Sequence, residues 1–171
     1  MEGVLFEDVL IIERQIGRKP LGVRRVVLRC EHNFPVVIEN ECEIDGKPFP
    51  TLFWLVCPKL CREISRLEQL GWISRFEKII NEDPDFERAY IDAHLQVREL
   101  RDKVVRNEGA RQILSRLGTG GIRNLRTVKC LHLHVADRLA GVKNPVGEMV
   151  LQMIDRPFCE GDRILCRELR A

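Results

Sequence analysis

The stretch Phe49-Pro-Thr-Leu-Phe-Trp-Leu-Val-Cys-Pro58 contains the change from strands to helices that decides the fold. Its apolar run, Leu52 to Cys57, has the length of a buried strand, and Pro58 suits the first turn of a helix. The residues that repeat on one side of this helix, before Gly71, are all leucine or isoleucine, namely Leu60, Ile64, Leu67 and Leu70. The stretch therefore predicts a strand that leads directly into an amphipathic helix.

Upstream of this stretch, the sequence predicts one helix and two further strands. Apolar residues at near-helical spacing predict a helix over residues 6–17, with Gly17 and Pro20 as stop signals. Runs rich in β-branched residues predict strands over residues 23–30 and 36–38, and Asp45-Gly46 predicts a turn before the next strand. We expect these segments to form an antiparallel sheet of about three strands.

Downstream, the pattern is helical up to about residue 155, apart from a break at Gly118-Thr-Gly-Gly121. Helices are predicted over residues 72–80, from Asp83-Pro84 to residue 104, up to residue 117, over 127–140, and from Asn144-Pro145 to residue 154. In the helix that begins at Asp83-Pro84, we expect His94 at the surface or its boundary. The tail from residue 156 has no clear period.

Strands followed by helices predict an α+β fold, in which a small antiparallel sheet near the N-terminus is packed by a predominantly helical C-terminal part. The length of 171 residues suits a single domain over residues 1–171. We expect it to comprise an N-terminal helix and strands over about 6–57, a helical part over about 58–155, and an irregular tail with Cys159 and Cys166 over 156–171.

Composition and charge exclude several classes of protein. With 44% hydrophobic residues the chain is too apolar to be disordered, and a net charge of +2 provides no global basic field for nucleic acid. No apolar run approaches the roughly 20 residues of a membrane span, and the acidic N-terminus lacks the layout of a secretory signal, so we expect a cytoplasmic protein. The seven cysteines, an odd number, are expected to be thiols or ligands rather than a disulfide framework.

The segment Val128-Lys-Cys-Leu-His-Leu-His-Val-Ala-Asp137 carries most of the reactive side chains. A helix over residues 127–140 places Cys130, His134 and Asp137 on one stripe and His132 on the opposite, buried arc. If the helix instead starts a residue or two later, Cys130 and His132 both lie in an extended segment and point to the same side. The spacing therefore predicts a shared site but leaves its exact members open.

A thiolate and neutral imidazoles are the usual ligands of zinc and also bind iron, so Cys130, His132 and His134 predict a zinc site or an iron–sulfur cluster. The preferred further ligand is Cys57, at the end of its predicted strand. The other candidates are Cys30, Cys159 and Cys166. Two alternatives stay open: Cys130 and His132 act as a catalytic thiol and its base, or the cysteines pack as small hydrophobes.

The glycine run before this segment predicts a pocket for an anion. Gly120 and Gly121 permit backbone conformations that expose successive N–H groups, and basic residues recur every three positions after them. These basic residues are Arg123, Arg126 and Lys129. The alternative is a flexible connector with solvated charges, because the run matches neither of the common phosphate-binding fingerprints.

The chain contains four motifs that are specific in combination: Pro48-Phe-Pro-Thr-Leu-Phe-Trp-Leu-Val-Cys-Pro58, Ile64-Ser-Arg-Leu-Glu68, Val128-Lys-Cys-Leu-His132 and Asn144-Pro-Val-Gly147. Together they resemble the bacterial domain-of-unknown-function family 501, over nearly the whole chain from Arg14 onward. The resemblance implies that Cys57, Lys129, Cys130 and His132 occupy motif positions, whereas position 134 varies and position 137, here aspartate, is often histidine. It favours Cys130 with His132 over the helical stripe.

These features predict a Cys/His metal- or cluster-binding protein with an adjacent anion pocket, acting on a phosphate-bearing metabolite or RNA. The resemblance also implies gene neighbours that encode a septum-formation initiator, enolase and an exopolyphosphatase-like enzyme. Such neighbours favour, as an alternative, a non-catalytic interaction module with a protein partner in cell division or envelope assembly. A thiol-dependent enzyme is the third hypothesis.

Overall fold

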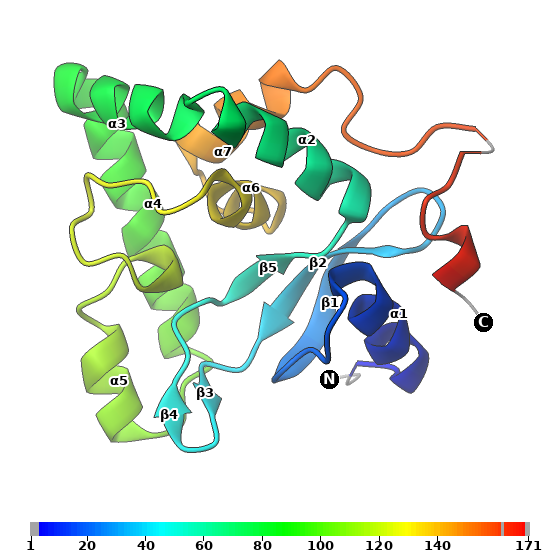
Figure 1. Ribbon diagram of the computed structural model, residues 1–171. Coiled ribbons are helices and arrows are strands. Elements are labelled where there is room, and N and C mark those ends of the chain that lie inside the picture. Colours follow the sequence, from blue (N-terminus) through cyan, green and yellow to red (C-terminus); the bar gives the residue numbers. More distant parts are fainter. Residues whose placement is uncertain (1–3, 162, 170–171) are drawn as a thin grey trace.

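The computed structural model describes residues 4–161 and 163–169, and Figure 1 shows their arrangement. Residues 1–3 and 170–171 of the expected domain, and residue 162 of the expected tail, lie outside the described residues. In the described part, a small sheet near the N-terminus is followed by a mainly helical remainder. This order confirms the predicted α+β class.

The sheet consists of β1 (Val23–Arg29), β2 (Pro35–Asn40) and β5 (Phe53–Leu55), paired antiparallel in the order β1-β2-β5. The predicted three-stranded sheet is confirmed. Pro35, which has no N–H to donate, is the first residue of the central strand, a position where proline costs the sheet little. A separate hairpin of β3 (Glu43–Ile44) and β4 (Lys47–Pro48) surrounds the predicted Asp45-Gly46 turn.

Strand β2 is buried over its whole length because both faces of the sheet are covered. On one face, Ile38 packs with Ile12 of helix α1 (Phe6–Ile16) and with Val56. On the other face, Val37 belongs to the main core, which the helices of the C-terminal part complete. This second face is the one next to the candidate site.

The helical part contains α2 (Pro58–Gln69), α3 (Trp72–Glu82), α4 (Pro84–Asp102), α5 (Glu108–Leu114), α6 (Leu131–Leu139) and α7 (Pro145–Met153), with short 3₁₀ turns η1 (Thr119–Gly121) and η2 (Arg167–Leu169). The predicted start signals are confirmed at two helices. Asp83 accepts the backbone N–H groups of Asp85 and Phe86 at the start of α4, and Asn144 accepts that of Gly147 at the start of α7.

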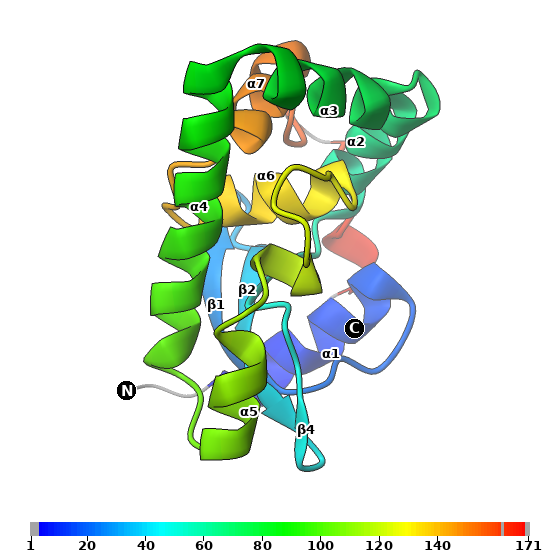
Figure 2. The ribbon, with the colours of Figure 1, turned by 90° about the vertical axis from the view of Figure 1, so that its left-hand side faces the viewer.

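Helix α6 lies between the sheet and α7 and is buried on most sides (Figures 1 and 2). The prediction that it starts near residue 127 was wrong: it starts at Leu131, and Cys130 before it is extended, with φ −163° and ψ 153°. Two side chains hold the preceding loop out of the helix, since Glu77 accepts the Val128 N–H and Glu68 accepts the Leu131 N–H. These two carboxylates are distant from the loop in the sequence, so a local sequence pattern does not reveal their hydrogen bonds.

The tail after α7 returns to the N-terminal helix. It crosses the upper part of Figure 1 and ends at η2, where Arg14 of α1 donates to the carbonyl oxygen of Leu169 at 2.6 Å. Within the described residues, no helix combines the length and the apolar character that crossing a lipid bilayer requires.

Candidate functional site

The loop that leads into α6 carries two of the functional candidates of the sequence, Lys129 and Cys130, and the helix itself carries His132. Glu77 of α3 accepts the Val128 N–H at 2.9 Å, and Glu68 of α2 accepts the Leu131 N–H at 2.7 Å. Lys129 and Cys130 are therefore held between two carboxylates, and His132 follows in the first turn of α6. Cys130 occupies the position directly before the helix.

The ring of His132 is oriented through both of its nitrogens. Nε2 lies 3.1 Å from the carbonyl oxygen of Cys61 and 3.3 Å from Ser65 Oγ, and Nδ1 lies 3.1 Å from Glu68 Oε1. Because a carbonyl oxygen only accepts, Nε2 must carry a proton and donate it to Cys61. Nδ1 is consequently the nitrogen that gains or loses a proton, or binds a cation.

Electrostatics favour a positive charge at this ring. Burial by itself lowers the pKa of His132, but the Cys130 side chain, the Glu68 carboxylate and the Cys61 carbonyl together raise it above the ordinary histidine value. The site therefore stabilises a cation next to Nδ1, Glu68 and Cys130.

Glu68, Cys130 and His132 each offer one ligand atom, and these three atoms all lie within 4.8 Å of one another. Among the described residues, no other set of three or more His, Cys, Asp or Glu side chains meets this distance. A carboxylate oxygen, a thiolate sulfur and an imidazole nitrogen are all zinc ligands. The bond from Nε2–H to a backbone carbonyl is also the arrangement in which metal-binding histidines are usually held.

Glu68 was not among the predicted ligands. It lies on a different element from Cys130 and His132, and helix α2 brings it to them across more than 60 positions. The one signal in the sequence was its place at the end of the motif Ile64-Ser-Arg-Leu-Glu68, next to the cysteine and histidine motif of the same family.

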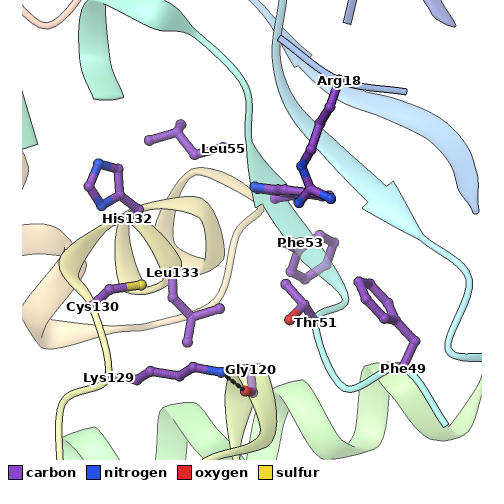
Figure 3. Close-up of a pocket in the computed structure, with 11 residues that line it drawn as sticks. Arg18, Phe49, Thr51, Phe53, Leu55, Gly120, Lys129, Cys130, His132 and Leu133 are labelled. Atoms are coloured by element: carbon purple, nitrogen blue, oxygen red, sulfur yellow. Dashed lines mark hydrogen bonds between the residues drawn. The ribbon is translucent and has the colours of Figure 1, made fainter. Parts of the chain in front are cut away.

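A pocket of about 300 Å³ lies beside this group, between α6 and β5 (Figure 3). Its walls include three aromatic residues, Phe49, Phe53 and Trp54. Figure 3 shows the Cys130 side chain directed toward this space, with Lys129 on the same side and Arg18 on the opposite side. The guanidinium of Arg18 stacks on the Trp54 ring, 4.7 Å from the ring centre.

Only two of the five predicted anion-binding residues line this pocket. Lys129 and Gly120 line the pocket, and Lys129 Nζ donates to the Gly120 carbonyl at 3.0 Å. Arg126 instead pairs with Glu87 at 2.6 Å on the exposed surface, and neither it nor Arg123 lines this pocket. Gly121 has positive φ and faces Pro50. The pocket thus combines Lys129 with Arg18, a residue that the sequence did not indicate.

His134 does not join the group around Cys130, because its ring lies in a buried network. Asn144 Nδ2 donates to Nδ1 at 3.0 Å, and Tyr90 Oη lies 3.0 Å from Nε2. Burial, with a contribution from His94, lowers the pKa of His134 to about 3. Both ring nitrogens of His134 are thus engaged by protein groups.

The expectation that His94 lies at or near the surface was wrong, since it is buried beside His134. The turn η1 covers this side of α4, and the Thr119 N–H donates to His94 Nδ1 at 3.1 Å. The turn that covers His94 is distant from α4 in the sequence, so a helical wheel of α4 alone does not include it.

Cys57 also lies outside the three-residue group. It ends the segment after β5 and immediately precedes α2, where burial raises its pKa to about 11. The thiols of Cys166 and Cys159, in the tail, contribute to this increase.

The fold and the site define an α+β protein with a Glu/Cys/His group, able to hold a metal ion, at the edge of an aromatic and cationic pocket. Residues 26–152 match the family described as "protein of unknown function (DUF501)", which is most of the chain. The chain therefore belongs to this family, as its motifs indicated. No curated protein and no solved structure matches the chain.

Proposed function

We propose that this protein binds a divalent transition-metal ion, with zinc as the best match, through Glu68, Cys130 and His132. The observation that carries the proposal is the orientation of His132. Its Nε2 proton is bonded to the Cys61 carbonyl, so the Nδ1 lone pair points to the side of Glu68 and Cys130. The lone pairs and negative charges of three donors that converge in this way repel one another unless a proton or a metal ion lies among them.

The number of donors supports a site that acts on a substrate. Structural zinc sites have four protein ligands, whereas catalytic sites have three and leave one position open. A bound zinc ion supplies Lewis acidity and a hydroxide-like water at neutral pH. The direction of the Cys130 side chain supports an open position that faces the pocket.

The pocket supports a small anionic substrate, such as a phosphate-bearing metabolite, over RNA. Lys129 and Arg18 provide positive charge at opposite sides, and the aromatic wall accepts a flat or apolar portion. A space of about 300 Å³ is at the lower end for small-molecule sites, and the net charge of +2 offers no extended field for a nucleic acid.

A thiol-dependent reaction is the second candidate, and one observation favours it. Cys130 directly precedes α6, and its side chain is one of the groups that raise the pKa of the neighbouring His132. Reactive thiolates are typically found at helix N-termini beside histidine. In this reaction Cys130 is the nucleophile, and His132 holds the proton at Nδ1.

Metal analysis of the full chain, purified without air or chelator, distinguishes the two candidates. We expect Cys130→Ser and His132→Ala to lose about one metal ion per chain, and the control Cys42→Ala, a buried cysteine that is not a member of the group, to lose none. If Cys130→Ser keeps the full metal content, the metal proposal is wrong. Selective alkylation of Cys130 in acidic buffer, with metal absent from the purified protein, then supports the thiol reaction.

A further inference from the structure

We propose that Arg18 is the specificity-determining residue of the pocket beside the Glu68–Cys130–His132 group. It binds a carboxylate or phosphate group at the end of the substrate that lies away from Cys130. The pocket therefore takes a small molecule with a flat or apolar middle and an oxyanion at its remote end. The presence of a substrate rests on the function proposed above, whereas the anion position itself requires no metal ion.

Arg18 reaches the pocket from the face of the sheet that α1 covers. Helix α1 ends at Gly17, whose φ of 72° is the left-handed conformation that glycine adopts readily, and Arg18 follows directly. In the order β1-β2-β5, strand β5 is at the edge of the sheet, so side chains from both faces meet there. Phe53 and Leu55 belong to the main core on the α6 face, whereas Trp54 packs with the cluster under α1. Arg18 lies on the Trp54 side and lines the pocket around this edge.

The guanidinium of Arg18 is oriented by the Trp54 ring. Its central carbon lies 4.7 Å from the ring centre, and Trp54 is itself held by strand pairing with Ile38 and by packing against the cluster under α1. An arginine that stacks on an aromatic ring uses its flat face and keeps the N–H donors at its edge for other partners. The stacking also reduces the rotamer freedom that ligand binding would otherwise have to remove. Arg18 is thus positioned before a ligand enters.

These donors have no partner among residues 4–161 and 163–169. Neither an ion pair nor a hydrogen bond involves the Arg18 guanidinium there, whereas Arg24 of β1 pairs with Glu39 at 3.0 Å. The described residues that line the pocket include no aspartate and no glutamate. Bonds to carboxylate and phosphate are the strong, charge-assisted ones that a guanidinium forms. A free guanidinium at a pocket without a carboxylate is therefore suited to an oxyanion from outside the chain.

Lys129, on the other side of the pocket, is not equivalent to Arg18. Its Nζ already donates to the Gly120 carbonyl at 3.0 Å, and an ammonium is a point charge without a preferred plane. The guanidinium of Arg18 instead can form two parallel bonds to one carboxylate or phosphate. Because Lys129 directly precedes Cys130, it lies at the reacting end of the pocket, and Arg18 lies opposite (Figure 3). The aromatic wall accepts the middle of the substrate.

The test is the binding of benzoate and phenyl phosphate, which each join an oxyanion to a flat ring, to the full chain as purified. Isothermal titration calorimetry measures the affinity, and the NMR signal of the Arg18 Nε–H reports contact at this side chain. We expect Arg18→Gln to weaken the binding of at least one probe about tenfold or more. Arg18→Lys, which keeps the charge but lacks the planar donors, is expected to restore only part of it. The probe that loses more identifies the oxyanion as carboxylate or phosphate.

Lys19→Gln is the matched control, because Lys19 is the next residue, is exposed and does not line the pocket. It removes the same charge from the same loop and is expected to leave both affinities within about twofold of wild type. The metal content of each sample, measured in parallel, separates the two proposals. Full metal content in Arg18→Gln with weaker probe binding supports both, whereas probe binding through Arg18 in a metal-free wild type refutes only the metal function.

Three results overturn the anion position at Arg18. The wild type binds neither probe, Arg18→Gln binds both as tightly as wild type, or Lys19→Gln weakens them as much as Arg18→Gln does. The last result would mean that the charge of the loop, rather than a guanidinium at the pocket, attracts the probes. Arg18 is exposed, so its variants are expected to fold, which circular dichroism verifies.

Discussion

The Nδ1 atom of His132 lies 3.1 Å from the Oε1 atom of Glu68, while the other nitrogen of the ring is committed to a backbone carbonyl. A lone pair and a carboxylate oxygen at this distance repel each other, so the pair requires a cation between them. In metal-free protein the cation is a proton, and in metal-loaded protein it is the ion. The same geometry thus makes metal binding compete with protonation.

Replacing Glu68 tests this relationship. In metal-free Glu68→Gln we expect the pKa of His132 to fall, because Glu68 is one of the groups that raise it. Since the folded pKa is raised, this contribution to stability is fully present below the unfolded value of about 6.5 and is lost as pH rises through the folded value. We also expect zinc affinity to fall at least about tenfold. NMR titration of the His132 ring and zinc titration measure the two effects.

Glu77→Gln is the matched control for this variant. Glu77 accepts a backbone N–H of the same loop but is not a member of the three-residue group. It is therefore expected to leave both the His132 pKa and the zinc affinity unchanged. Equal effects of the two variants would show that loop anchoring, rather than the charge beside Nδ1, determines both properties.

The pocket cation Lys129 is expected to bind anions, whereas Arg126 is not. Lys129 lines the pocket, and Arg126 pairs with Glu87 on the exposed surface. In metal-loaded protein we expect Lys129→Met to weaken binding of inorganic phosphate about tenfold, which corresponds to about 1.4 kcal/mol, and Arg126→Met to leave it unchanged. Fluorescence of Trp54, which lines the pocket, reports binding. A uniform loss in both variants would argue against a site at Lys129.

Asn144 is expected to be a structural residue of the buried His134 network. It accepts the Gly147 N–H at the start of α7 and donates to His134 Nδ1. We expect Asn144→Ala to lower the free energy of unfolding by about 2 to 4 kcal/mol, because it removes a helix cap and leaves a buried nitrogen without a donor. Asn107→Ala removes only the cap of α5 and should cost about 1 kcal/mol. Urea unfolding compares them, and equal costs would contradict the role of the network.

Asp137 makes the stability of the fold depend on pH between about 4 and about 8. Burial raises its pKa to about 8, against the opposing effects of Thr119, Arg101 and Asn144. The unfolded chain ionises this carboxyl at about 4, so the stability of the folded state falls as pH rises from about 4 to about 8 and then levels off.

Asp137→Asn lacks this ionisation and is expected to gain stability over wild type across that interval, by at most about 1.4 kcal/mol per pH unit. Urea unfolding of both proteins at about pH 5 and about pH 8 measures the change. Parallel stability curves would mean that the carboxyl is already ionised in the folded protein.

Local signals in the sequence predicted most of the elements. Asp83 with Pro84 marked the start of α4, and Asn144 with Pro145 marked the start of α7, because caps and first-turn prolines act within a few residues. The apolar run before Pro58 likewise indicated a buried strand that leads into a helix. The start of α6 was misplaced because Glu68 of α2 accepts the N–H of Leu131, its first residue, and Glu77 of α3 accepts that of Val128 in the preceding loop.

The sequence by itself determined the class of fold, the strand and helix order, and the importance of Cys130 with His132, since these follow from periodicity, short-range caps and motifs. Only the tertiary structure decided which side chains meet. It joined Glu68 to His132, moved His134 into a buried network with Tyr90, and left Cys57 outside the group that contains Cys130. The physical reason is that these contacts join segments that are far apart in the chain. They depend on how helices pack on the sheet, which no local pattern contains.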